Sequence, residues 1–224
     1  MTEPVRHAVY FAPPAASPWG RFGQQWLDGA WRPPAIDAAR WQSLLRAPRR
    51  YGFHATLKAP FRLAPGCTPD VLAQRLDALA AQCRAVPLGA LVPRAFDGYV
   101  ALVPEAPPPA LQALAERCVL ELDDLRAPLT AAERARRRPE RLDERARALL
   151  DAYGYPQVLE RFRFHMTLAM TERDGDAAEV LACANAALAA VQRETPLVLD
   201  RLCLCEEPGP GEDFVRVRDA VLTG

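Results

Sequence analysis

The sequence predicts an α+β fold of two lobes related by an approximate two-fold axis, and three observations support it. The pattern Phe-His-x-Thr-Leu occurs at residues 53–57 and again at 164–168. The two histidines of this repeat lie 111 residues apart, about half of the 224-residue chain. A histidine strand, a helix and two further strands are predicted in this order twice. We therefore expect two mostly antiparallel sheets that face a central cleft, with helices outside.

The strands are predicted from short runs of aromatic, β-branched and aliphatic residues. Asp97-Gly98 between two such runs indicates a hairpin turn. In order, the expected strands are Arg6–Ala12, Tyr51–Lys58, Val86–Phe96, Tyr99–Val103, Phe162–Ala169, Pro196–Cys205 and Phe214–Arg218.

The helices are predicted from one-sided apolar stripes and from their start signals. Thr68-Pro69-Asp70 combines a capping hydroxyl, a proline at the first helical position and an early acid. Thr130-Ala-Ala-Glu133 has the form of a capping box and opens an arginine-dense helical region, Arg134–Leu150. Further helices are expected near Ser17–Asp28 and Ile36–Leu45, after Pro107–Pro109, and after Asp174-Gly175.

The length of the chain and the repeat of the histidine motif at half that length together predict one domain over residues 1–224. The first lobe would cover about 1–125 and carry the first motif, and the second would cover about 126–224 and carry the second. An exchange of strands between the lobes stays open at this point.

Composition narrows the class of protein. The formal net charge is zero, which argues against a partner such as long nucleic acid. No apolar run has the length of a membrane span, and the first residues do not form a signal peptide. The six cysteines contain no Cys-x-x-Cys pair, so we expect reduced thiols in a cytoplasmic protein. The oligomeric state is not predicted.

The chemistry of the repeat follows from strand alternation. Residues two apart on a strand share a face, so His54 lies beside Thr56 and His165 beside Thr167. Two imidazoles across a cleft can act as proton acceptor and proton donor near neutral pH. The two hydroxyls can donate to phosphate oxygens. Neither motif offers further ligands with metal spacing, so we expect no metal and no other cofactor.

With two His-x-Thr motifs, each on a predicted strand that is followed by a helix and further strands, the chain resembles the two-histidine (2H) phosphoesterase superfamily. The segments 48–63, 126–130 and 154–156 resemble one branch of it, which is named for phosphonate metabolism. The resemblance extends from about residue 5 to about residue 217. It implies a bilobal 2H fold and a cyclic phosphodiesterase.

The resemblance further implies metal-independent hydrolysis of a small cyclic phosphodiester, such as 5-phosphoribosyl 1,2-cyclic phosphate. The alternatives are RNA 2′,3′-cyclic phosphodiesterase or 2′,5′-ligase-like processing of RNA ends, and a non-catalytic module that binds a nucleotide or phosphate. The substrate would be a small phosphorylated sugar or nucleotide. Candidates to bind it are basic or aromatic and lie near the motifs: Tyr51, Lys58, Arg49, Arg126, Arg163 and Tyr155.

Overall fold

The computed structural model describes residues 5–171, 173 and 175–224, and its strands pair in antiparallel fashion. One sheet has the order β2-β1-β8-β9, a second has the order β4-β5-β6, and β3 pairs with β7. The predicted α+β class with antiparallel sheets is confirmed. The strands are β1 Arg6–Phe11, β2 Ala55–Phe61, β3 Val86–Pro87, β4 Leu91–Phe96, β5 Tyr99–Pro104, β6 Met166–Met170, β7 Val198–Leu199, β8 Arg201–Glu207 and β9 Val215–Val221.

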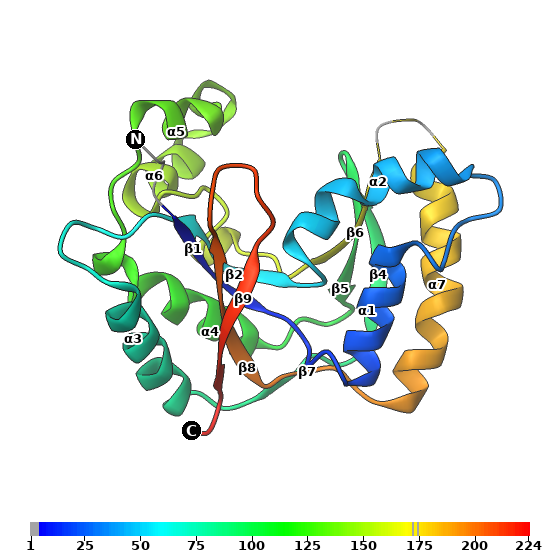
Figure 1. The fold of residues 1–224 in the computed structure, drawn as a ribbon, viewed down its shortest axis with the longest axis horizontal. Helices are drawn as coiled ribbons and strands as arrows, with labels where there is room; N and C mark the ends of the chain where they lie inside the picture. Colours follow the sequence, from blue (N-terminus) through cyan, green and yellow to red (C-terminus); the bar gives the residue numbers. More distant parts are fainter. Residues whose placement is uncertain (1–4, 172, 174) are drawn as a thin grey trace.

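The helices lie outside these sheets, as Figure 1 shows. Helices α3 and α4 contact the four-stranded sheet, whereas α2 and α7 contact the three-stranded sheet and α1 contacts α7. The α-helices are α1 Pro18–Asp28, α2 Ala38–Tyr51, α3 Pro69–Ala81, α4 Pro109–Leu120, α5 Ala131–Arg136, α6 Glu144–Tyr153 and α7 Asp176–Glu194. Short 3₁₀ turns are η1 Asp123–Leu125, η2 Pro139–Arg141 and η3 Leu159–Arg161.

Each large sheet combines strands from both halves of the chain. The element order β2-α3-β3-β4-β5 recurs later in the chain as β6-α7-β7-β8-β9, so the predicted order occurs twice with one difference. The strands predicted at Val86–Phe96 and Pro196–Cys205 are each divided into a short strand and a longer one. However, β2 lies in the sheet that contains β8 and β9, and β6 pairs with β5. This exchange places β6 beside β5 of the first half, and it places β2 in one sheet with β8 and β9, with β1 between β2 and β8.

Local signals define the helix ends where the sequence predicted them. The hydroxyl of Thr68 accepts from the Val71 amide at 3.3 Å, and Pro69 begins α3. The arginine-dense region after Thr130 is two helices and not one continuous helical stretch. Arg138 has φ +49° and precedes Pro139, which cannot donate a helical hydrogen bond and disfavours a helical residue before it. Asp174, expected before α7, lies outside the described residues.

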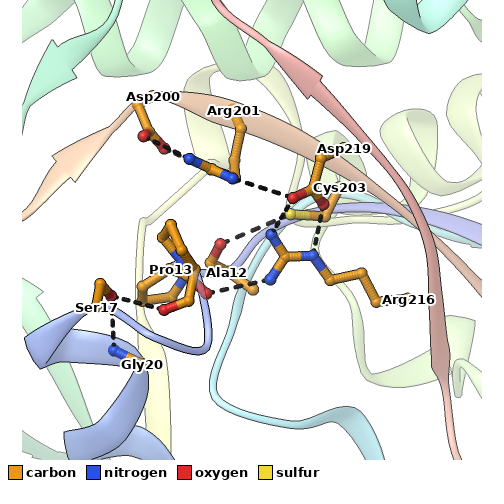
Figure 2. A network of polar contacts seen from close by, with 10 residues as sticks. Ala12, Pro13, Ser17, Gly20, Asp200, Arg201, Cys203, Arg216 and Asp219 are labelled. Atoms are coloured by element: carbon orange, nitrogen blue, oxygen red, sulfur yellow. Dashed lines mark hydrogen bonds and ion pairs between the residues drawn. The ribbon is translucent and has the colours of Figure 1, made fainter.

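Polar contacts fix the connection between β1 and α1 against the four-stranded sheet (Figure 2). Arg216 of β9 donates to the Pro13 carbonyl at 3.1 Å and pairs with Asp219, which also pairs with Arg201. The Ser17 hydroxyl accepts from the Gly20 amide at 3.0 Å and so begins α1. The segment that leads into α1 is therefore held close to β9.

The core continues from one sheet to the other through buried apolar side chains. All six cysteines are free thiols. No helix within the described part of the chain is long and apolar enough to cross a membrane.

Candidate active site

The two histidines lie immediately before their strands, at matching positions in the two sheets. Nδ1 of His54 donates to the Gly52 carbonyl at 2.9 Å, and Nδ1 of His165 donates to the Arg163 carbonyl at 2.8 Å. A carbonyl oxygen can only accept, so Nδ1 carries the proton in the neutral form of each ring. Nε2 of each ring is therefore the atom left to accept a proton or, when protonated, to donate one.

The motif threonines face the same cavity as the histidines. His54, Thr56, His165 and Thr167 all line one cavity of about 530 Å³. The Thr56 hydroxyl lies 3.3 Å from Nε2 of His54 and can donate to it. Two rings and two hydroxyls from different sheets thus meet at one place, which sequence spacing alone does not establish.

Burial controls the protonation of His54. It lowers the pKa of His54 to about 4, against the weaker opposing effect of its hydrogen bond to Gly52. The positive charge of protonated His165 lowers the pKa of His54 further. Both imidazoles line the same cavity, so a charge on one ring acts on the other. At neutral pH His54 is a neutral proton acceptor.

Aromatic rings hold His54 in place. Tyr51 stacks on His54 with centroids 5.7 Å apart and on Phe214 at 5.1 Å. The Tyr10 ring lies 4.2 Å from the His54 ring. Burial raises the pKa of Tyr10 well above its usual value, so its hydroxyl stays protonated. His54 therefore has little freedom to turn away from the cavity.

Arginines give the cavity a positive potential. Arg6 and Arg50 both pair with Glu207, whose side chain is 1% exposed, and Arg62 pairs with Glu133 at 2.9 Å. These residues line the cavity together with Arg136 and Arg137. Five arginines against two glutamates leave an excess of positive charge beside the histidines, which suits a phosphorylated ligand.

The predicted binding residues separate into two groups. Tyr51 and Tyr155 line the histidine cavity. Arg49 donates to the Leu27 carbonyl, and the exposed Arg163 is not among the described residues that line the cavity. Arg126 pairs with Asp123 at 2.8 Å and lines a separate small cavity.

Lys58 was expected on the same face as His54, but the structure places it elsewhere. Its ammonium group donates to the Val119 carbonyl at 3.1 Å and to Asp123 at 3.0 Å, and the residue is 3% exposed. The pairing of β1 with β2 shifts register between Thr56 and Lys58. This irregularity breaks the alternation, so Lys58 turns toward α4.

Several cavity residues were not in our predicted set, and two kinds of signal bear on them. Arg6 and Tyr10 share one face of the predicted first strand by alternation, so that strand could have been considered. Arg136 and Arg137 carry no such signal, because an arginine-rich helix usually indicates a solvated surface. Within the described residues, no group of three His, Cys, Asp or Glu side chains is placed to hold a metal ion.

The fold and the cavity define an α+β protein with two histidines at a phosphate-compatible site. The model of the family described as "Protein of unknown function (DUF1045)" matches residues 56–215, and the chain belongs to this family. The match includes the whole second motif but only Thr56 and Leu57 of the first, so His54 lies outside it. The description gives no reaction, so membership of the 2H superfamily stays a prediction.

Two curated relatives carry the name ribose 1,5-bisphosphate phosphokinase PhnN. The protein from Janthinobacterium sp. (strain Marseille) is 40% identical over 223 residues, which are 94% of this chain and 49% of the relative. The protein from Laribacter hongkongensis (strain HLHK9) is 36% identical over 171 residues, which are 73% of this chain and 40% of the relative. The chain spans about half the length, or less, of these relatives.

These names contradict the reaction predicted from the sequence. We expected a hydrolase, a cyclic phosphodiesterase, whereas the relatives are named as a phosphokinase. The prediction of hydrolysis, and of the enzyme class with it, is therefore wrong by this comparison. The physical reason is that paired imidazoles specify proton transfer beside a phosphate, but not the group that accepts the phosphoryl moiety.

Proposed function

We propose that the histidine cavity binds a phosphorylated ribose and positions it for phosphoryl transfer, with one phosphate between His54 and His165. The observation that carries this proposal is that both histidines and both motif threonines line one cavity rich in arginine. The relatives' name refers to ribose 1,5-bisphosphate, which is a sugar of this class. A role in phosphonate metabolism and a bilobal 2H arrangement of the cleft are parts of the same proposal.

Each side chain has a chemical role in this proposal. A phosphate monoester has a second pKa of about 6, so part of it carries a proton near neutral pH. Nε2 of neutral His54 accepts a hydrogen bond from this proton and takes the proton up as the phosphate oxygen attacks, because formation of the new bond makes the proton more acidic. The hydroxyls of Thr56 and Thr167 donate to the non-reacting oxygens, and His165 donates from Nε2 when protonated.

We assign sugar-phosphate binding to this chain, and not nucleotide binding. The P-loop pattern Gly-x-x-x-x-Gly-Lys-Ser/Thr does not occur in the sequence. The single lysine, Lys58, is buried against Asp123 and Val119 and cannot reach a nucleotide phosphate in the histidine cavity. The phosphoryl donor would then be held by a protein segment equivalent to the part of the relatives that this chain does not match.

The proposal is tested by titrating the purified chain with ribose 1,5-bisphosphate in a calorimeter. His54→Gln and His165→Gln should each weaken binding by about tenfold or more, because each removes a charge-assisted hydrogen bond. His7→Gln is the matched control, since Nδ1 of His7 lies 3.3 Å from the Glu206 carboxylate and the residue does not line the cavity. Undiminished affinity in both cavity variants, or no binding by the wild-type chain, would refute the proposal.

A further inference from the structure

Two of the arginines that line the histidine cavity, Arg136 and Arg137, have no carboxylate partner among the described residues. Of the five arginines that line the cavity, Arg6, Arg50 and Arg62 form ion pairs with glutamates. For Arg136 and Arg137 no carboxylate lies within ion-pair distance in the described ranges 5–171, 173 and 175–224. Of the three net positive charges that five arginines and two glutamates leave in the cavity, two therefore belong to Arg136 and Arg137, and the third is shared by Arg6 and Arg50 around Glu207.

The structure holds this pair of arginines at the cavity by two devices. Glu133 accepts from the Thr130 amide in a capping box and also pairs with Arg62, next to the end of β2. The hydrogen bonds from Arg62 lower the pKa of Glu133 to about 2, so this attachment of α5 persists over the physiological pH range. At the end of α5, the Arg137 guanidinium lies over the Tyr155 ring, 4.9 Å from its centroid.

The other arginines of this segment have different surroundings. Arg134 lies on the same helix but pairs with Asp151 at 2.9 Å, and it does not line the histidine cavity. Arg161 pairs with Asp143. Arg136 and Arg137 thus combine two features: they line the histidine cavity, and no carboxylate among the described residues pairs with them.

We propose that Arg136 and Arg137 form a second anion subsite, which binds the distal phosphate of a doubly phosphorylated sugar. This inference rests on the proposed function, which places the other phosphate between the histidines. A guanidinium presents a planar pair of donors that matches two phosphate oxygens. A cavity of about 530 Å³ is within the usual range for a small ligand. The subsite makes the protein select a bisphosphate over a monophosphate.

The test compares the affinities of the full chain for ribose 1,5-bisphosphate and ribose 5-phosphate by calorimetry. The double variant Arg136→Gln/Arg137→Gln should bind the bisphosphate about 10- to 100-fold more weakly than wild type does. Its affinity for the monophosphate should stay within about threefold of wild type, so that the preference for the bisphosphate disappears. Circular dichroism verifies that the variant is folded.

The control is Arg134→Gln/Arg141→Gln, which removes the same number of charges from the same segment but outside the cavity. It should keep the preference for the bisphosphate. An equal loss of affinity for both sugars in the cavity variant, or no loss for either, would overturn the subsite. A wild-type chain that binds neither sugar would instead contradict the proposed function, and the subsite with it.

Discussion

His54 is the residue at which the fold most strongly changes the chemistry of a side chain. Its Nδ1 donates a hydrogen bond to the Gly52 carbonyl, and the rings of Tyr10 and Tyr51 pack against its imidazole. Burial lowers its pKa to about 4. In an unfolded chain the same imidazole would have a pKa near 6.5. The difference links protonation to folding.

The sign of this linkage gives the first prediction. Between about pH 6.5 and about pH 4 the unfolded chain binds a proton at residue 54 that the folded chain excludes. The contribution of His54 to stability is therefore present above pH 6.5 and is lost as the pH falls toward 4. It should amount to roughly 1–3 kcal/mol.

The contribution of His54 is measured by urea unfolding of the wild type and of His54→Gln, each at about pH 7 and about pH 4.5, which gives the free energy of unfolding. The variant should lose less stability than the wild type over this interval, because carboxylates titrate equally in both. An NMR titration in which His54 has a pKa near its ordinary value would rule this account out.

At the scale of elements, the close contact between α1 and the segment before β2 positions His54. A Cβ atom added at Gly23 would lie 2.2 Å from Cδ1 of Phe53, the residue before His54. Both residues are buried, and Phe53 also makes an edge contact with Phe22 at 5.7 Å. The absence of a side chain at residue 23 therefore sets how closely α1 approaches the first motif.

Gly23→Ala is predicted to destabilise the protein, although alanine favours a helix by about 1 kcal/mol. The clash with Phe53 should cost about 1–3 kcal/mol beyond that gain and should displace His54, so sugar-phosphate binding weakens as well. Thermal unfolding and calorimetric titration provide the two measurements. The control is Gln24→Ala at the adjacent exposed residue, which should change neither the stability nor the affinity for the sugar phosphate. A Gly23→Ala protein that is more stable than wild type would contradict the packing argument.

In strand β2, the register shift against β1 determines which residues line the histidine cavity and which are buried in the protein. Simple alternation from His54 through Thr56 places Lys58 in the cavity. The register shift against β1 instead turns Lys58 toward Val119 and Asp123, while Ala59 and Pro60 line the cavity. A bulge depends on the partner strand, so alternation read along one strand could not predict it.

At the scale of the whole molecule, each large sheet depends on both halves of the chain. The first half supplies β1 and β2 to a sheet that is completed by β8 and β9, and the second half supplies β6 to the sheet of β4 and β5. A division near residue 125 would separate β1 from β8, β3 from β7 and β5 from β6, and would leave apolar faces exposed in both halves.

Fragments 1–125 and 126–224 are therefore predicted to be unfolded when each is produced alone. Amide NMR spectra should show poor dispersion for each fragment, and mixing the two should restore dispersion and sugar-phosphate binding. The intact chain is the reference. A well-dispersed spectrum from either isolated fragment would show that the halves fold independently and that the sheet exchange is not required.

The sequence by itself determined the α+β class, the doubled order of elements and the two histidine motifs, because alternation, caps and turn residues are local signals. Tertiary structure decided that His54 and His165 share a cavity, that Lys58 leaves it, and that Arg136 and Arg137 enter it. These outcomes depend on strand pairing between distant segments and on which charged side chains form ion pairs. The reason is that pairing and burial are set by contacts far apart in the chain, which a local pattern does not encode.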